Sequence, residues 1–377
     1  MVYDFLIIGG GMAGVSLADA LAPVASVCLL ECEAHLGYHS TARSAALFAP
    51  AYGSALYRAL ARASEDFLVA PRSGEFPDTV LSPRGTLFIA RAEQLGRLEA
   101  EAELVRSGGA QVEWLSTEQA RRHVPLLRPE YVAAALYEEQ VRDIDVEALF
   151  QGFIRRARAA GAQLLTGADF TVHGRTGGVW DLVRCGEPLR ARTVVNAAGA
   201  WAEGIGRRFG AAPLGLMVLR RSAAIIDAPP GVDVSRWPAV FDVDDRFYLK
   251  PDAGRLLISP ADEDPVSPGD AYTDEISIPL AVERIQAALA LEVRQVRREW
   301  AGLRTFAPDR DPVIGYDPGV EGFFWCAGQG GYGIQTAPAF ARSAAALARR
   351  EPLPEPLVRD GLTPAAISPV RFAGRGG

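Results

Sequence analysis

The N-terminus of the chain carries a glycine pattern that strongly constrains the fold. Residues 5–8 form a continuous apolar run, which is typical of a strand buried on both faces of a parallel sheet. Gly9, Gly11 and Gly14 follow at once with the spacing G-x-G-x-x-G. Good helix formers with apolar spacing occupy residues 15–22. This order predicts a strand, a tight turn and a helix, which is the start of a parallel βαβ unit.

Each glycine of this unit has a physical role. Gly9 allows the tight turn, Gly11 lets a pyrophosphate approach the backbone, and Gly14 lets the helix pack against the strand. The free amides and the dipole at the helix N-terminus attract phosphate groups. A second apolar run at 27–30 ends at Glu31, whose carboxylate can accept hydrogen bonds from both ribose hydroxyls. The unit therefore predicts binding of a dinucleotide, and Glu31 disfavours the 2′-phosphate of NADP.

Length and charge narrow the class of protein. A chain of 377 residues predicts two closely packed domains with a large core. The net charge is −7, from 39 basic and 46 acidic residues. Because phosphate backbones are bound by clustered positive charge, this balance argues against a nucleic-acid partner.

Cysteine and histidine usage exclude two further classes of site. The four cysteines have no C-x-x-C spacing and the chain has only four histidines, so we expect neither a disulfide scaffold nor a metal site. The N-terminus lacks the basic region of a signal peptide, and no uncharged run is long enough for a transmembrane segment. We therefore expect a cytoplasmic protein.

Two later segments indicate where a flavin would lie. Residues 192–201 predict a strand that ends in a turn of small residues, including Ala198 and Gly199. Residues 322–328 predict another strand, and the glycine-rich segment 329–336 leads from it into an apolar helix. A glycine-rich turn at a helix N-terminus suits the polar edge of a flavin ring or its ribityl chain.

These motifs occur in an order that resembles one family of flavoproteins. The D-amino-acid oxidase superfamily of FAD-dependent oxidoreductases is indicated by GGGMAG with Glu31, HSTARSAA, TVVNAAGAWA, FYLKPDAG, WAGLRTFAPD and GQGGYGIQT. Within that family the motifs look most similar to those of bacterial D-arginine dehydrogenase. The resemblance extends from Asp4 to about Pro369.

The resemblance implies an α/β fold with a discontinuous FAD-binding domain of Rossmann type, into which an α+β substrate domain is inserted. We place the FAD-binding domain at 1–80, 140–215 and 305–377. The substrate domain would then comprise 81–139 and 216–304.

The resemblance also implies which residues contact FAD. The predicted set is Gly9, Gly11, Gly14, Glu31, Arg43, Ser44, Ala198, Gly199, Gly302, Gly330, Gly331, Tyr332, Gly333 and Ile334. The sarcosine-oxidase branch attaches its flavin through a cysteine, and Gly302 stands at that place here. We therefore predict non-covalent FAD.

Four residues are predicted to act on the substrate, an α-amino acid. Arg304 and Arg221 would bind its carboxylate, because the planar guanidinium forms two parallel hydrogen bonds to such a group; the alternative for both is a surface salt bridge. Tyr248 would add a hydrogen bond to the carboxylate, although a core aromatic residue is the alternative. Tyr52 lies in a loop that corresponds to a mobile lid in the related dehydrogenase. Backbone contacts from Gly331 and Tyr332 would complete the site.

Departures from the relative suggest a different substrate side chain. Leu47 and Ala49 replace a histidine and a threonine in the lid loop, and Phe48 lies between them. Thr86 stands where the relative has an acidic residue for a cationic side chain, so a guanidinium would lack its charged partner unless another carboxylate supplies it. We therefore expect a neutral or hydrophobic D-amino acid.

The expected reaction is hydride transfer from Cα to flavin N5, without a general base. The imino acid product would hydrolyse to a 2-oxo acid and ammonia, and a quinone or oxygen would accept the electrons. A sarcosine- or glycine-type amine oxidase is the main alternative. A flavin-binding electron-transfer subunit and a transfer-RNA-modifying flavoprotein are alternatives of other classes.

Overall fold

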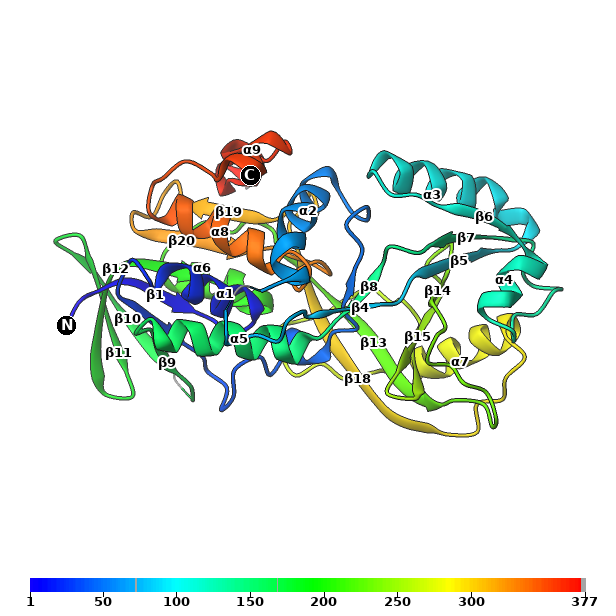
Figure 1. The fold of residues 1–377 in the computed structure, drawn as a ribbon. Helices are drawn as coiled ribbons and strands as arrows, with labels where there is room; N and C mark the ends of the chain where they lie inside the picture. The colour runs from blue at the N-terminus through cyan, green and yellow to red at the C-terminus, as the bar shows by residue number, and fades with distance from the viewer. Residues whose placement is uncertain (72, 168, 374–377) are drawn as a thin grey trace.

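The computed structural model describes residues 1–71, 73–167 and 169–373. Figure 1 shows two lobes, one built on an eight-stranded sheet and one on a nine-stranded sheet. A three-stranded sheet lies between them and consists of β3 (Leu47–Phe48), β8 (Arg142–Ile144) and β4 (Leu81–Pro83). The N-terminal strand and the last described helical turn, at Pro369–Phe372, both belong to the first lobe (Figure 1).

The first lobe has a parallel sheet at its centre. The strand order is β10-β11-β12-β1-β2-β9, with β20 also paired to β12 and β19 to β20. The central strands are β1 (Tyr3–Ile8), β2 (Val27–Leu30), β9 (Gln163–Leu165), β12 (Glu187–Asn196) and β20 (Phe323–Ala327). β10 (Phe170–Thr176), β11 (Val179–Arg184) and β19 (Val313–Tyr316) are antiparallel additions. The predicted strands at 5–8, 27–30 and 322–328 therefore belong to one sheet.

Helices cover both faces of this sheet. On one face α1 (Met12–Leu21) packs between α5 (Val146–Ala159) and α8 (Ala337–Ala348), and α2 (Ala55–Val69) packs on α8. The other face packs against α6 (Ala202–Arg208) and the hairpin β10–β11. The buried apolar runs of β1, β2 and β20 follow from this double cover, since neither face of these strands meets water.

The second lobe has a largely antiparallel sheet. Its order is β17-β13-β16-β15-β14-β5-β7-β6, with β18 paired to β13. The strands are β5 (Thr86–Ala90), β6 (Glu113–Ser116), β7 (Ala134–Glu138), β13 (Met217–Asp227), β14 (Ala239–Asp242), β15 (Tyr248–Asp252), β16 (Arg255–Ser259), β17 (Asp264–Pro265) and β18 (Val296–Phe306). One face packs on α3 (Leu95–Ser107), and the other on α4 (Thr117–His123) and α7 (Ser277–Ala288). 

The two large sheets draw on different parts of the chain. Strands of the first sheet lie within 1–80, 140–215 and 305–377, and strands of the second within 81–139 and 216–306. The assignment of these parts to FAD and to substrate stays a prediction. None of the helices in the described ranges combines the length and apolar character needed to cross a bilayer. The same ranges contain no cluster of His, Cys, Asp and Glu suited to a metal ion.

The antiparallel pair β13–β18 connects the two lobes. The register places Leu219 opposite Arg304 and Arg221 opposite Gly302. At its far end, β18 contacts the first lobe, because the Ser40 hydroxyl donates to the Leu303 carbonyl at 2.5 Å and the Gly330 amide donates to the Thr305 carbonyl at 2.8 Å.

Two buried carboxyl groups lie between the second sheet and α3. Glu138 in β7 lies opposite Thr86, Glu101 is on α3, and each glutamate residue is only 4% exposed. An oxygen of each carboxyl group, and the Thr86 hydroxyl, have no hydrogen-bond partner among the described residues. Burial, reinforced by the neighbouring charge of Glu101, raises the pKa of Glu138 to about 7.

This raised pKa predicts a pH-dependent loss of stability. The pKa of Glu138 is higher in the folded chain than its ordinary value of 4.5, so the folded state favours the protonated form, and stability falls as pH rises from 4.5 to about 7. The substitution Glu138→Gln, which mimics the protonated form, should stabilise the protein by about 3 kcal/mol at about pH 8 and by less than about 1 kcal/mol at about pH 5. Thermal unfolding midpoints at both pH values measure this.

The matched control is Glu139→Gln, which removes an exposed carboxylate from the next position in the chain. We expect no pH-dependent change in its unfolding midpoint. A gain for Glu138→Gln that is the same at both pH values would show that the effect does not come from ionisation of this group.

Candidate cofactor and substrate site

A cavity of about 300 Å³ is lined by residues of both lobes. Its walls come from the β1–α1 turn, the segment 37–45, the turn after β12, strands β13, β15 and β18, and the segment 328–334. The predicted site residues that line it are Gly9, Gly11, Glu31, Arg43, Ser44, Ala198, Gly199, Arg221, Tyr248, Gly302, Arg304, Gly330, Gly331, Gly333 and Ile334. Gly14, Tyr52 and Tyr332 are not lining residues of this cavity.

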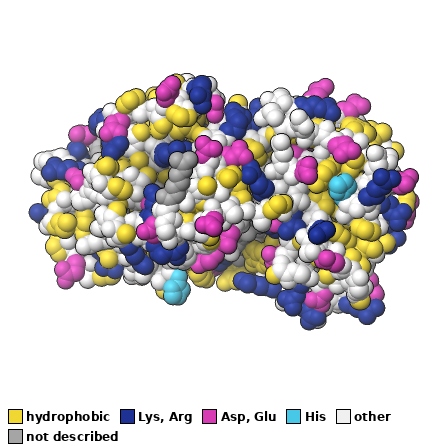
Figure 2. All heavy atoms as spheres, viewed as in Figure 1, with side chains coloured by type: hydrophobic (Ala, Val, Ile, Leu, Met, Phe, Trp, Pro, Cys, Tyr) yellow, Lys and Arg dark blue, Asp and Glu magenta, His cyan; other side chains and the backbone are white. Residues whose placement is uncertain are grey.

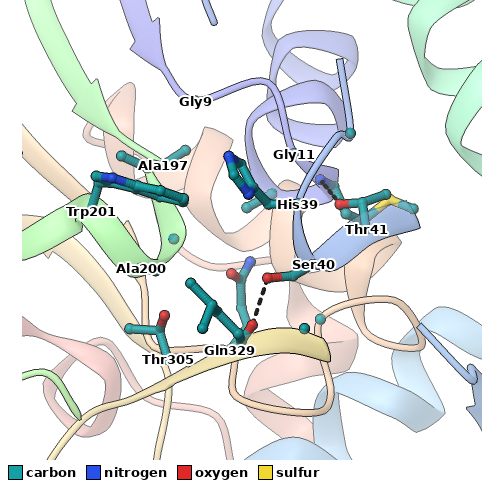
Figure 3. A pocket seen from close by; sticks show the side chains of 18 of the residues that line it. Gly9, Gly11, His39, Ser40, Thr41, Ala197, Ala200, Trp201, Thr305 and Gln329 are labelled. Carbon is teal, nitrogen blue, oxygen red and sulfur yellow. Dashed lines mark hydrogen bonds between the residues drawn. The ribbon is translucent and has the colours of Figure 1, made fainter. Parts of the chain in front are cut away.

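The β1–α1 turn leaves no room for side chains at two glycines. Gly9 has φ +112°, and a Cβ there would lie 2.4 Å from the Ala197 carbonyl oxygen. A Cβ at Gly14 would lie 1.9 Å from the Gly9 carbonyl oxygen. Gly14 thus serves helix packing rather than the cavity wall. Gly11 is the N-cap of α1 and lines the cavity, where the Thr41 hydroxyl accepts a hydrogen bond from the next amide, that of Met12, at 3.0 Å (Figure 3).

Glu31 is held in place by backbone amides. One of its carboxylate oxygens accepts from the Gly10 amide at 2.7 Å and the other from the Glu33 amide at 2.9 Å. The residue directly follows β2 and lines the cavity. A carboxylate oxygen has more than one lone pair, so this group can also accept hydrogen bonds from ribose hydroxyls.

Aromatic residues that the sequence did not assign to the site also line the cavity. The rings of His39 and Trp201 lie 4.4 Å apart, and His39 Nε2 lies 2.9 Å from a carboxylate oxygen of Glu33 (Figure 3). Tyr38 packs edge-on against His39 at 4.8 Å. His39 and Trp201 belong to the motifs HSTARSAA and TVVNAAGAWA, so the motifs marked the right segments without indicating these side chains.

The segment 328–334 lies against β18 because it is rich in glycine. Gly330 has φ +53°, and a Cβ there would lie 2.1 Å from the Phe306 ring. A Cβ at Gly331 would lie 3.0 Å from the Arg304 guanidinium. The backbone of this segment can therefore approach the same ligand that Arg304 contacts.

Arg304 and Arg221 form a pair of cations at one end of the cavity. Both side chains lie on the same face of the β13–β18 pair as diagonal neighbours, and Gly302 opposite Arg221 leaves room beside that guanidinium. Among the described residues Arg304 has no hydrogen-bond or ion-pair partner. Burial and the nearby charge of Arg221 lower the pKa of Arg304, although an arginine remains protonated. Such a pair can bind an anion.

Tyr248 lines this end of the cavity, whereas Tyr332, Tyr57 and Tyr52 form a group of neighbouring rings outside its lining. Tyr248 is 7% exposed and its ring stacks on Phe241 with centroids 5.4 Å apart. Tyr332 stacks on Tyr57 at 4.2 Å, and the Tyr57 hydroxyl donates to the Gly328 carbonyl at 2.6 Å. The Tyr52 ring lies 6.1 Å from that of Tyr332. Burial raises the pKa of Tyr332 and of Tyr57, so both phenols stay protonated near neutral pH and act as donors.

Three side chains of the predicted lid segment do not line the cavity, and Arg43, which does, has a further role. Phe48 does not make the cavity apolar: it is fully buried in the core of the first lobe, because β3 pairs with β8 and turns the ring inward. Leu47 and Ala49 are not lining residues either. The Arg43 guanidinium donates to the carbonyls of Ala271 and Ala301 and thereby connects the lobes.

The fold and the cavity define a flavoprotein oxidoreductase of the nucleotide-binding α/β class. The chain belongs to the FAD dependent oxidoreductase family, whose model matches residues 4–347. The predicted superfamily, fold class and FAD cofactor are confirmed by this match and by solved relatives. The more specific likeness to D-arginine dehydrogenase and the absence of a covalent bond to FAD stay predictions.

This chain is similar in sequence to two animal proteins. The chain is 27% identical to bovine FAD-dependent oxidoreductase domain-containing protein 1, over 71% of this chain and 62% of the relative. It is 27% identical to human mitochondrial dimethylglycine dehydrogenase over 88% of this chain and 40% of the relative. The chain thus spans less than two thirds of the length of either protein.

Solved structures show the same fold along the whole chain. Glycine oxidase from Geobacillus kaustophilus superposes with a TM-score of 0.83 at 24% identity, covering 99% of each chain. L-proline dehydrogenase from P. horikoshii superposes with a TM-score of 0.80 at 23% identity, covering 98% of each chain.

The residues present fit FAD. The glycines of the β1–α1 turn leave a side-chain-free approach to the start of α1, where the dipole favours phosphate. Glu31 lies where a ribose would be bound, and the 328–334 backbone lies at the Arg304 end, where the isoalloxazine ring would be held. 

The contact between Gly14 and Gly9 predicts the effect of one methyl group. Gly14→Ala should push α1 away from β1, destabilise the first lobe by about 1–3 kcal/mol and lower the FAD bound per chain. Visible absorbance of the purified protein and its unfolding midpoint measure both effects.

Gly96→Ala is the matched control. Gly96 also lies in a helix, α3, but a Cβ there would have no neighbour within 4 Å. We expect full FAD content and unchanged or slightly raised stability. Equal FAD content in both variants would contradict the packing role of Gly14.

Proposed function

We propose that the chain uses FAD to oxidise the Cα–N bond of a small amino acid whose carboxylate is bound by Arg304 and Arg221. The observation that carries this proposal is the unpaired guanidinium of Arg304 beside Arg221 in the cavity. A half-buried cation without a partner is partly desolvated at a cost, and a bound carboxylate with bidentate geometry would offset that cost.

In the proposed mechanism the protein orients the substrate and protects it from water. Arg304 and Arg221 hold the carboxylate, and the Tyr248 hydroxyl, which has no hydrogen-bond partner among the described residues, donates to it. Tyr52 and Tyr332, whose rings lie 6.1 Å apart, would limit the access of solvent to the bound substrate. FAD, when bound, supplies the hydride acceptor. The oxidised product is an imino acid, which water converts to a 2-oxo acid and ammonia.

The substrate side chain is the less constrained part of the proposal. Thr86 is not among the residues that line the cavity, and neither is Glu138 opposite it, so the structure does not place Thr86 beside the substrate as the sequence suggested. A neutral D-amino acid rather than D-arginine therefore rests on the comparison of motifs alone. A quinone or oxygen as acceptor and a cytoplasmic location stay predictions.

A glycine- or sarcosine-type substrate is the second candidate. Relatives in sequence include dimethylglycine dehydrogenase and mouse sarcosine dehydrogenase, and glycine oxidase is a structural neighbour. Such substrates share the carboxylate on which the site is built and differ in having no side chain or a methylated nitrogen.

Anaerobic mixing of the FAD-loaded protein with single amines tests the reaction class. We expect bleaching of the flavin by a neutral D-amino acid such as D-leucine, faster than by D-arginine, and no bleaching by L-leucine. Bleaching only by glycine or sarcosine would favour the second candidate. A fully loaded flavin that no amine reduces would overturn the proposal.

Arg304→Lys tests the carboxylate site. The lysine keeps the charge but loses the planar pair of donors, so we expect kcat/KM to fall about 10- to 100-fold with unchanged FAD content. The control is Arg298→Lys, an exposed position of the same strand, which should leave kcat/KM unchanged. Steady-state kinetics with the best substrate of the panel measures both, and equal activity of the two variants would contradict the assignment.

A further inference from the structure

The carboxylate of Glu263 connects Arg221, which lines the cavity, to a third arginine, Arg310. It lies in the connection between β16 and β17, where Arg221 Nη2 donates to it at 3.0 Å. Arg310, in the turn after β18, donates to both of its oxygens at 3.0 and 2.9 Å. The Arg310 guanidinium in turn packs over the Phe306 ring at 4.0 Å.

Glu263 is the anionic partner of Arg221 among the described residues. The Arg221 side chain is 14% exposed, lines the cavity and has a buried Nε atom without a hydrogen-bond partner in the described ranges. The Glu263 side chain is 34% exposed, so the pair lies at the boundary between cavity and solvent. A partly exposed ion pair is worth little and can exchange partners.

The charges explain why a carboxylate belongs at this place. Without a ligand, Arg221 and Arg304 repel each other, and Glu263 reduces the net positive charge that they present. When a substrate carboxylate arrives, it can replace Glu263 on Arg221, while Arg310 retains Glu263 through its two hydrogen bonds. One carboxylate then takes the place of another, and the number of charges around Arg221 does not change.

We infer that Glu263 is a positioning residue that competes with the substrate carboxylate for Arg221 and so sets the affinity of the site for anions. This inference rests on the proposed function, because it takes Arg221 and Arg304 as the carboxylate site. Glu263 aligns the Arg221 guanidinium while the cavity holds no anion and lowers the affinity for every carboxylate that competes with it.

Glu263→Gln tests the competition. Gln has the same shape but no charge, so propanoate, a carboxylate without an amine, should bind the FAD-loaded variant about tenfold more tightly than the wild-type protein. With amine substrate, KM should fall while kcat stays within about twofold. Isothermal titration calorimetry with propanoate and steady-state kinetics measure the two effects. A merely structural role of Glu263 predicts the opposite, since a disordered Arg221 would bind propanoate more weakly.

Two further variants separate the competition from a loss of structure. Asp264→Asn is the matched control, because Asp264 pairs with Arg220, which is absent from the cavity lining; propanoate should bind it as tightly as the wild type. Arg310→Gln releases Glu263 from its second partner, so Glu263 should hold Arg221 more fully and propanoate should bind several times more weakly. Combining Arg310→Gln with Glu263→Gln should restore tight binding.

Propanoate binding does not depend on turnover, so the two proposals can fail separately. Tighter binding to Glu263→Gln without flavin reduction by any amine would support the competition and overturn the proposed reaction. Unchanged or weaker binding of propanoate to Glu263→Gln would overturn the competition, even with an amine that reduces the flavin.

Discussion

The register of the β13–β18 pair is the constraint on which the substrate end of the cavity depends. Opposite residues of an antiparallel pair share a face, so pairing of Arg221 with Gly302 and of Leu219 with Arg304 places both guanidinium groups on one side. A slip of one residue would turn one of them away from the cavity. The glycine opposite Arg221 also matters, because Gly302 lines the cavity and a Cβ there would already lie 3.4 Å from Arg43 Cβ, so a larger side chain would extend into the cavity.

The β13–β18 pair also connects the two lobes through hydrogen bonds. Ser40 and Gly330 of the first lobe bond to the carbonyls of Leu303 and Thr305, on either side of Arg304 in sequence. Arg43 of the first lobe donates to Ala301 on the same strand. The loops that line the cavity and the proposed carboxylate-binding residue Arg304 are thus fixed to one strand, which suits the proposed reaction, in which Cα and the flavin must be aligned closely. Figure 2 shows acidic and basic side chains intermingled over most of the face it presents.

Much of the cofactor side could be predicted from sequence because its signals are local. The apolar run of β1, the glycine spacing and the helix at 337–348 depend on neighbours within a few positions, and all three appear in the structure as predicted. Contacts between distant residues could not be predicted in this way. The bond between Arg221 and Glu263 joins residues 42 positions apart, and that between Arg43 and Ala301 joins residues 258 apart.

Phe48 shows that the residue types of a segment do not by themselves predict which side chains line a pocket. An apolar residue in a lid-like segment suggests an apolar lining, but a two-residue strand, β3, is enough to turn the ring into the core. His39 and Trp201 illustrate the converse, since each lies in a motif identified from the sequence, yet the contact between their rings joins segments 162 positions apart. Motifs identify segments, whereas pairing partners decide which side chains of a segment reach the site.

The electrostatics of the cavity also bear on why the proposed reaction needs no general base. A substrate ammonium must lose a proton before hydride leaves Cα. Two arginines at the carboxylate end create a positive potential that lowers the pKa of a nearby ammonium, as a like charge does for any cationic acid. Tyr332 and Tyr57 cannot take the proton, because burial raises their pKa and keeps them protonated. Deprotonation is therefore favoured by the field of the site, and the proton can pass to solvent.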